Sequence, residues 1–266
     1  MNERKRLALV GGGLLGRIIA KAAADGLLPD YDLVGVYSRT PASAAETAAL
    51  AGCRACASLE ELLDLAPDFV AEAASVQALR DLALPVLSRG IQLVVLSAGA
   101  FADDAFYEQV RACAAAGGGR VHVASGAIGG FDVLQTITLM AQAAGQEETA
   151  AVHARKRPAS LQNSPLYHEG LLQAETEAFS GTAREAIDLL PTQVNVTVAA
   201  ALTTTGPAQT AVRITTIPGF QGDDHRITAE ACGVRAELDI YSASSTVAGW
   251  SVVALLRNLA APISFH

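Results

Sequence analysis

The sequence has little of what marks membrane proteins and nucleic-acid-binding proteins. No apolar run is long enough to span a bilayer, and the polar residues 2–6 lead straight into an apolar segment, so neither a membrane span nor a signal peptide is expected. The 19 Lys and Arg are outnumbered by 27 Asp and Glu, which gives a formal net charge of −8. This balance argues against binding to nucleic acid or to an anionic membrane surface. We therefore expect a cytoplasmic protein.

Cysteine and aromatic residues are also scarce. Cys53 and Cys56 have C-x-x-C spacing, but Cys113 and Cys232 form no second pair that would complete a zinc site. We therefore predict no metal site and interpret the cysteines as reduced structural thiols, with a redox pair as the alternative. Aromatic residues make up 5% of a chain that is 51% hydrophobic. The core is accordingly expected to consist of Ala, Val, Leu and Ile, which is typical of α/β proteins.

Glycine, by contrast, is concentrated in a motif close to the N-terminus. An apolar run is followed by Gly11, Gly13 and Gly16 in a Gly-x-Gly-x-x-Gly pattern, and Leu14 and Leu15 begin a helical pattern. In such a strand–turn–helix unit the first glycine permits the turn, the second lets a diphosphate approach the backbone, and the third allows close packing. The amides at the helix start attract phosphate. The motif predicts a bound dinucleotide, and a purely structural turn is the alternative.

The residues after the second expected strand, 32–37, bear on the choice of dinucleotide. NAD enzymes usually carry an acidic residue there, which binds the ribose hydroxyls. Here Ser38 and Arg39 follow the strand, and the next acidic residue is Glu46. A hydroxyl followed by an arginine suits a 2′-phosphate, which favours NADP as the cofactor, with NAD as the other candidate. A solvated turn is the alternative interpretation of these residues.

The order of the expected elements indicates two domains. Strands alternate with helices up to residue 124, which predicts an α/β Rossmann domain with a doubly wound parallel sheet over 1–124. Strands then outnumber helices, so a second, α+β domain with an antiparallel or mixed sheet is expected over 125–245. Its strands are expected at 150–157, 208–217, 226–231 and 234–241, and its helices at 133–144, 169–175, 182–188 and 191–203. Residues 246–266 are expected to form a C-terminal helix that returns to the first domain.

Ligands of open parallel sheets bind beyond the carboxyl ends of the strands. The glycine-rich segment 125–132 follows the last expected Rossmann strand, and its backbone amides are expected to meet the nicotinamide carboxamide or the substrate. Residues 72–75, which include Ala73, and residues 97–99 end neighbouring strands and are expected to border the same crevice. A hinge between domains is the alternative interpretation of 125–132.

Four residues of the second domain are candidates for contact with the ligands. His225 follows two aspartates in an expected polar loop, where neighbouring carboxylates favour the charged imidazole and a pKa near neutrality. Lys156 and Arg157 belong to a dense basic cluster that suits the carboxylates of a dicarboxylic substrate, with a solvated strand end as the alternative. Asn195 is a lone amide in an apolar helix, a pattern that indicates a packing hydrogen bond or a ligand contact.

Several of these segments occur together, and in the same order, in the L-aspartate dehydrogenase family, which the sequence resembles over most of its length. The matching segments are 7–16, 70–75, 94–100, 125–132, 155–158, 181–186 and 195–202, together with His225. The segments 181–186 and 195–202 and the histidine are specific to this family among Rossmann enzymes.

The resemblance implies NAD(P)-dependent oxidative deamination of L-aspartate to iminosuccinate. That product hydrolyses to oxaloacetate and ammonia or enters NAD biosynthesis. The resemblance also implies nicotinamide-side contacts for Ala127 and Asn195 and an active-site role for His225. We expect the second domain to close the crevice and to form a homodimer through its sheet.

The sequence departs from the family pattern at three places. Ser38 stands where the family usually has Asp, Asp223 stands where it usually has Asn, and 241–246 lacks the proline and lysine of the family's C-terminal stretch. Two alternatives therefore remain, since a fold does not fix a function. One is a related NAD(P)-dependent reductase or dehydrogenase acting on another amino or imino acid. The other is a non-catalytic NAD(P)-binding sensor, which has no use for His225.

Overall fold

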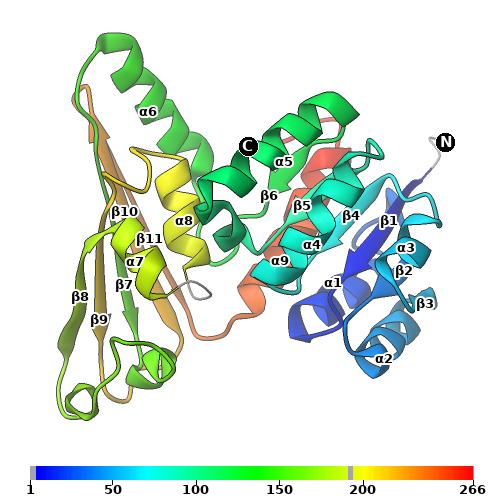
Figure 1. The fold of residues 1–266 in the computed structure, drawn as a ribbon, viewed down its shortest axis with the longest axis horizontal. Helices are drawn as coiled ribbons and strands as arrows, with labels where there is room; N and C mark the ends of the chain where they lie inside the picture. The colour runs from blue at the N-terminus through cyan, green and yellow to red at the C-terminus, as the bar shows by residue number, and fades with distance from the viewer. Residues whose placement is uncertain (1–3, 191–193, 266) are drawn as a thin grey trace. The chain divides into compact units, whose positions relative to one another are not determined.

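The computed structural model describes residues 4–190 and 194–265 of the chain. These residues form two compact units, each with its own sheet (Figure 1). The first unit comprises residues up to Gly126 together with the segment from Thr246 onward, and the second comprises Ala127–Ser245. The first residues of the helix expected at 191–203, and the terminal His266, lie outside the described residues.

The first unit contains a sheet of short strands. These strands are β1 (Lys5–Val10), β2 (Tyr31–Tyr37), β3 (Arg54–Cys56), β4 (Phe69–Glu72), β5 (Gln92–Val95) and β6 (Val121–Val123). They lie in the order β3-β2-β1-β4-β5-β6, and every pairing is parallel. The central strands β1, β4 and β5 are largely buried, as a parallel sheet covered by helices requires. This strand order confirms the predicted Rossmann fold.

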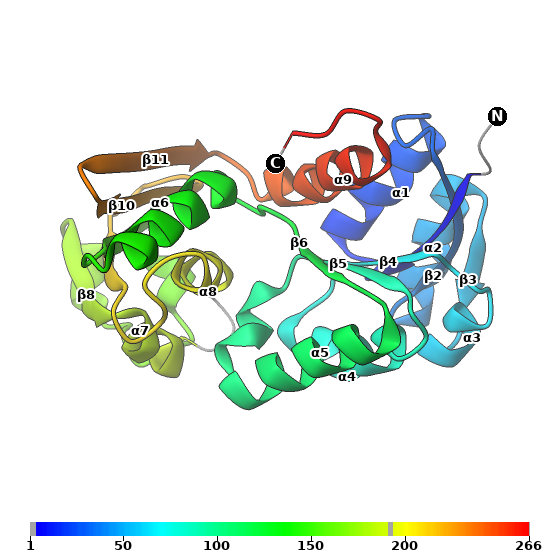
Figure 2. The same cartoon turned by 90° about the horizontal axis from the view of Figure 1, so that it is seen from above.

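Helices cover both faces of the parallel sheet. They are α1 (Leu14–Ala24), α2 (Pro41–Ala51), α3 (Leu59–Leu63), α4 (Val76–Leu87), the 3₁₀ helix η1 (Ala98–Ala102), α5 (Asp104–Gly117) and α9 (Thr246–Ala260). Figure 2 shows α1 and α9 on one face, and α4 and α5 on the other. The hydroxyl of Tyr31, at the amino end of β2, donates to the carbonyl oxygen of Leu256 in α9 at 2.9 Å. The C-terminal helix is therefore part of the first unit.

The second unit contains a mixed sheet. Its elements are α6 (Phe131–Ala144), β7 (Thr149–Lys156), η2 (Pro158–Leu161), η3 (Glu169–Leu172), β8 (Thr176–Thr182), α7 (Ala183–Leu189), α8 (Asn195–Leu202), β9 (Ala211–Thr216), β10 (Asp223–Ala231) and β11 (Val234–Ser242). The strand order is β11-β10-β7-β9-β8, in which β7 and β9 are parallel and the other neighbours are antiparallel. The predicted α+β architecture with a mixed sheet is confirmed.

One strand of this sheet has no counterpart in the expectations from the sequence. β8 is an edge strand, and all its side chains are half-buried or exposed. Neither face of β8 therefore carries the buried apolar side chains from which strands are recognised in a sequence. Its position is set by its antiparallel pairing with β9, which joins residues far apart in the chain.

The register of the mixed sheet decides which side chains share a face. Lys156 lies opposite Asp223, and Ala154 lies opposite His225, in the antiparallel pair of β7 and β10. Directly opposed residues point to the same side of a sheet, so Lys156, Asp223 and His225 share one face. Figure 1 shows α6, α7 and α8 along one side of this sheet, and α6 contacts β10 while α8 contacts β7.

Candidate functional site

The glycine motif forms the connection between β1 and α1. Gly11 has a φ of +122°, and a Cβ there would lie 2.4 Å from the carbonyl oxygen of Ala73. A Cβ at Gly16 would lie 1.9 Å from the carbonyl oxygen of Gly11. Both distances are far shorter than non-bonded contacts allow. The turn therefore requires glycine at both positions, and it brings Gly11, Gly16 and Ala73 together.

Gly13 faces open space instead. It is exposed, and a Cβ there would have no other atom within 4 Å. α1 begins with Leu14 and Leu15 directly after it, and no side chain in the described part of the chain caps the helix. The first turn of α1 also carries no acidic residue. An uncapped helix start beside an open glycine fits the diphosphate of a dinucleotide. Gly13 and the first residues of α1 therefore fit a bound dinucleotide.

The end of β2 lies beside the glycine turn. The amide of Gly11 donates to the carbonyl oxygen of Tyr37, the last residue of β2, at 2.8 Å. Ser38 follows and is half-buried, whereas Arg39 is exposed and has no ion pair within residues 4–190 and 194–265. The next acidic residue, Glu46, is paired with Arg17. The turn that follows β2 therefore presents a hydroxyl and a guanidinium rather than a carboxylate.

His225 is not in a loop, contrary to expectation. It lies in β10, paired with both β7 and β11, and is only 7% exposed. Burial, and then the positive charge of Lys156, lower its pKa from 6.5 to about 4, although Asp223 acts in the opposite direction. The expectation of a charged imidazole titrating near neutrality was therefore wrong, because desolvation outweighs the carboxylate. Its Nδ1 atom is buried and has no hydrogen-bond partner in the described structure.

Lys156 is the second buried polar residue of this group. It is the last residue of β7 and 9% exposed. Burial lowers the pKa of its ammonium group, and the facing carboxylate of Asp223 raises it. The structure thus brings together two of the predicted residues, Lys156 and His225, on one face of the sheet. A buried histidine with a free ring nitrogen beside a lysine is suited to bind an anionic or hydrogen-bonding ligand.

The other candidates of the second unit lie in different settings. Arg157 directly follows β7 and is exposed. Ala127 lies in the turn between β6 and α6 and is half-exposed. Asn195 is half-buried and is the first residue of α8, not a residue of a helix interior as expected. The difference arises because α8 begins at Asn195.

Glu72 is a residue that sequence reasoning did not single out. It ends β4 and is 0% exposed, and its carboxylate accepts hydrogen bonds from the backbone that follows β4 and from the backbone that follows β5. The available signal was an acidic residue at the end of an otherwise apolar, buried strand. A buried carboxylate needs such partners, because an unpartnered charge is costly to bury.

The cysteines fit a structural role. All four are free. Burial raises the pKa of Cys53 to about 11 and also raises that of Cys56, which disfavours the thiolate that redox or metal chemistry needs. Among the residues described, no cluster of three or more His, Cys, Asp or Glu is arranged to hold a metal ion. No helix within the described ranges combines the length and apolar character needed to cross a membrane.

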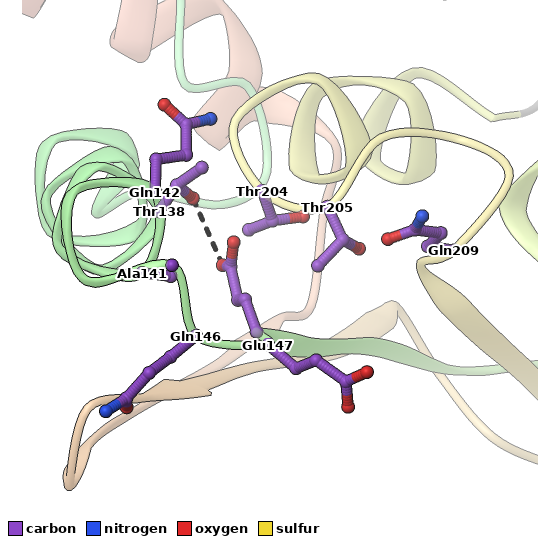
Figure 3. A pocket seen from close by; sticks show the side chains of 10 residues that line it. Thr138, Ala141, Gln142, Gln146, Glu147, Thr204, Thr205 and Gln209 are labelled. Carbon is purple, nitrogen blue, oxygen red and sulfur yellow. Dashed lines mark hydrogen bonds between the residues drawn. The ribbon is translucent and has the colours of Figure 1, made fainter.

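A hollow of about 550 Å³ lies in the second unit at the C-terminal end of α6 (Figure 3). The hydroxyl of Thr138 donates to the carboxylate of Glu148 at 3.1 Å, and burial raises the pKa of Glu148. Gln142, Gln146 and Glu147 also line it and are exposed. None of the predicted site residues lines this hollow, so we do not assign the active site to it.

Together, the parallel Rossmann sheet, the open glycine turn and a separate α+β unit with buried polar residues are the features of a two-domain dinucleotide-binding protein. Comparison with known proteins specifies it further. Residues 138–259 match the C-terminal region of aspartate dehydrogenase, and residues 9–124 match the NAD-binding domain of homoserine dehydrogenase.

Individual relatives agree with these matches. L-aspartate dehydrogenase 2 of Bordetella pertussis is 34% identical over 246 residues, which cover 90% of this chain and 88% of that protein. The L-aspartate dehydrogenase of Methanocella arvoryzae is 30% identical over 273 residues, covering 97% of this chain and 98% of that protein. The crystal structure of aspartate dehydrogenase from Thermotoga maritima is similar in fold, with a TM-score of 0.76 at 24% identity over 99% of this chain and 100% of that one.

The chain therefore belongs to the aspartate dehydrogenase family, as the sequence motifs predicted. It is an enzyme, and its cofactor is NAD or NADP. A hyperthermophilic archaeal homoserine dehydrogenase in complex with NADPH has the same fold, with a TM-score of 0.62 at 12% identity over 94% of this chain and 95% of that one.

Proposed function

We propose that this enzyme oxidises L-aspartate to iminosuccinate, which hydrolyses to oxaloacetate and ammonia. The observation that carries the proposal is the pair of buried residues Lys156 and His225, with the half-buried Asp223 on the same sheet face, which lies within the region matching aspartate dehydrogenase. The unpartnered Nδ1 of His225 supports a ligand at this group, because a buried polar atom without a partner is costly.

The proposal gives the basic residues the task of binding the substrate. The ammonium of Lys156 or the guanidinium of Arg157 binds a carboxylate of L-aspartate. Lys156 is buried at the end of β7, whereas Arg157 is exposed to solvent. Because a bound dicarboxylate offsets the positive charge of Lys156, it raises the pKa of His225 from its value of about 4.

His225 acts on a proton in this proposal. Its neutral imidazole carries one donor and one acceptor, so it is able to hold the substrate amine or to take a proton from water when the imine is hydrolysed. Bound NAD(P)⁺ would supply the acceptor for the hydride of the α-carbon. Gly11, Gly13 and the amides of Leu14, Leu15 and Gly16 hold the diphosphate, and Ser38 and Arg39 hold the 2′-phosphate. Ala73, Ala127 and Asn195 are assigned to the nicotinamide side.

The reverse reaction tests this proposal. The protein is given NADPH or NADH with oxaloacetate, in the presence and in the absence of ammonium, and oxidation of the nicotinamide is followed by absorbance. Oxidation is expected only when ammonium is present, because the substrate in this direction is the imine. Oxidation without ammonium would indicate reduction of a keto group, and no oxidation in either condition would support a cofactor-binding protein without activity.

The choice between the two cofactors is a separate prediction. NADP is expected to bind at least as tightly as NAD. Ser38→Asp is expected to shift the ratio of the two dissociation constants toward NAD by about tenfold, because a carboxylate repels the 2′-phosphate and accepts from free ribose hydroxyls. Fluorescence titration of both cofactors measures the ratio. Ala42→Asp, an exposed position nearby, adds the same charge as a control and is expected to leave the ratio unchanged.

The proposal also covers assembly and cellular context. Residues 1–124 hold the dinucleotide, residues 125–245 bind the substrate and form a homodimer through the mixed sheet, and the helix of 246–266 completes the first domain. We also propose that the enzyme is cytoplasmic and that its product, iminosuccinate, is a precursor for NAD biosynthesis.

A further inference from the structure

Glu72 joins two loops at the carboxyl edge of the parallel sheet. Its Oε1 atom accepts from the amides of Ala74 at 2.7 Å and Ser75 at 3.0 Å, and from the hydroxyl of Ser97 at 2.8 Å. Its Oε2 atom accepts from the amides of Leu96 at 3.2 Å and Ser97 at 3.0 Å. One fully buried carboxylate thus holds the segment after β4 and the segment after β5.

This network continues to the glycine turn. The amide of Ala73 donates to the carbonyl oxygen of Val10 at 2.9 Å, and the carbonyl of Ala73 lies against Gly11. In a sheet of this order a dinucleotide lies across the carboxyl edge, with its two halves on opposite sides of the first strand. β2 and β3 lie on the adenosine side of β1, and β4 and β5 lie on the nicotinamide side.

We propose that Glu72 is a positioning residue of the cofactor site, whose carboxylate fixes residues 73–75 and 96–97 in the conformation that receives the nicotinamide half of NAD(P). The inference rests on the use of NAD(P) and not on the identity of the substrate. Glutamate is required because all the groups that face its carboxylate are hydrogen-bond donors. The amide of a glutamine would turn its own N–H donors toward at least two of them in either orientation.

The variant Glu72→Gln tests the proposal through binding rather than activity. Calorimetric titrations compare NADP⁺ with 2′,5′-ADP, which contains only the adenosine half. The dissociation constant of NADP⁺ is expected to rise about tenfold or more, because hydrogen bonds to a charged acceptor are lost on the nicotinamide side. The dissociation constant of 2′,5′-ADP is expected to stay within about twofold, since its site on β1 and β2 is untouched.

A matched control separates positioning from general loss of stability. Tyr31→Phe removes the buried hydrogen bond to Leu256 from the opposite, amino edge of the same sheet. It is expected to lower the melting temperature without changing the ratio of the two dissociation constants. An unchanged ratio in Glu72→Gln, or an equal change in Tyr31→Phe, would overturn the proposal.

A milder variant covers the case in which Glu72→Gln does not fold. Ser97→Ala removes only the hydroxyl donor at 2.8 Å and keeps the four backbone hydrogen bonds to the carboxylate. Its ratio of dissociation constants is expected to shift in the same direction by about threefold, the scale of one hydrogen bond. A folded Ser97→Ala protein with an unchanged ratio would contradict the positioning role.

Discussion

Replacing His225 by alanine is expected to lower the turnover of L-aspartate by about 10²-fold or more, the usual scale for a positioned acid–base group. The imidazole is buried beside Lys156, and its Nδ1 has no partner in the described protein, so the substrate is the group it is available to contact. Cofactor binding is expected to persist, because the glycine turn belongs to the other unit. Steady-state kinetics and a titration with NADP⁺ measure the two quantities.

Stability must be measured beside turnover, because His225 lies in a strand. Its truncation leaves a cavity and is expected to lower the melting temperature, which a loop residue would not do. Ile227→Ala is the matched control, since Ile227 is 1% exposed and lies two residues along the same strand on the same face. It is expected to cost about 2–5 kcal/mol of stability and to keep near-normal turnover. Equal losses of turnover in both variants would make His225 a structural residue.

The low pKa of His225 also has a predictable effect on stability. The unfolded chain protonates this residue near pH 6.5, whereas the folded protein protonates it only near pH 4. Between these two pH values the unfolded state therefore binds more protons than the folded state, and a lower pH favours unfolding. The stability that the neutral imidazole contributes is thus fully present above pH 6.5 and is lost as the pH falls toward 4. In the variant His225→Gln, the free energy of unfolding is expected to depend less on pH between about 4 and 6.5. Urea unfolding at several pH values measures this dependence.

A second large effect is expected at the glycine turn. Gly13→Ala is expected to leave the melting temperature nearly unchanged, because the added methyl group meets no atom within 4 Å. The same methyl group occupies the space through which the diphosphate approaches the backbone, so the dissociation constant of NADP⁺ is expected to rise by about 10²-fold. Gly16→Ala is expected to lose both stability and binding, because its Cβ would lie 1.9 Å from the carbonyl oxygen of Gly11.

Thermal melts and cofactor titrations of the same samples check this prediction. Ser58→Ala is the control with the opposite expected result to Gly13→Ala, a loss of stability with unchanged cofactor binding. It removes the hydroxyl that caps α3 and leaves the glycine turn intact. It is expected to cost about 1 kcal/mol and to bind NADP⁺ normally. Normal binding by Gly13→Ala would place the diphosphate away from this turn and contradict the assigned site.

The parts of the fold that follow from local patterns were predictable from the sequence. The Gly-x-Gly-x-x-Gly turn and the alternation of apolar strands with helices specify the Rossmann sheet, and the structure has its strand order. Gly11 and Gly16 are required by contacts within the turn itself and with Ala73. These contacts join residues that are close in sequence or that directly follow the neighbouring strand, so a short sequence motif is enough to predict them.

The parts that depend on distant pairing were not predictable. Asp223 and Asp224 resemble a polar loop, yet both belong to β10, because Arg155 in β7 pairs with Asp224 at 3.1 Å and Lys156 faces Asp223. His225 was consequently expected in a loop with a pKa near neutrality, whereas its burial in the strand lowers that pKa to about 4. The role of Glu72 was equally hidden, since two of its donors lie 24 and 25 residues further along the chain.

The initial rate of nicotinamide reduction with L-aspartate is the decisive measurement for the proposed oxidation of this amino acid. The protein is incubated with NADP⁺ or NAD⁺ and one of L-aspartate, L-glutamate, L-alanine or L-malate, and the absorbance of the reduced cofactor is followed. Reduction is expected with L-aspartate, and little or none with L-alanine, which lacks the second carboxylate, or with L-malate, which has a hydroxyl group in place of the amine. Reduction with L-glutamate is expected to be slower than with L-aspartate, because its second carboxylate lies one methylene further from the α-carbon. No reduction with L-aspartate, or faster reduction with one of the other three, would contradict the proposal.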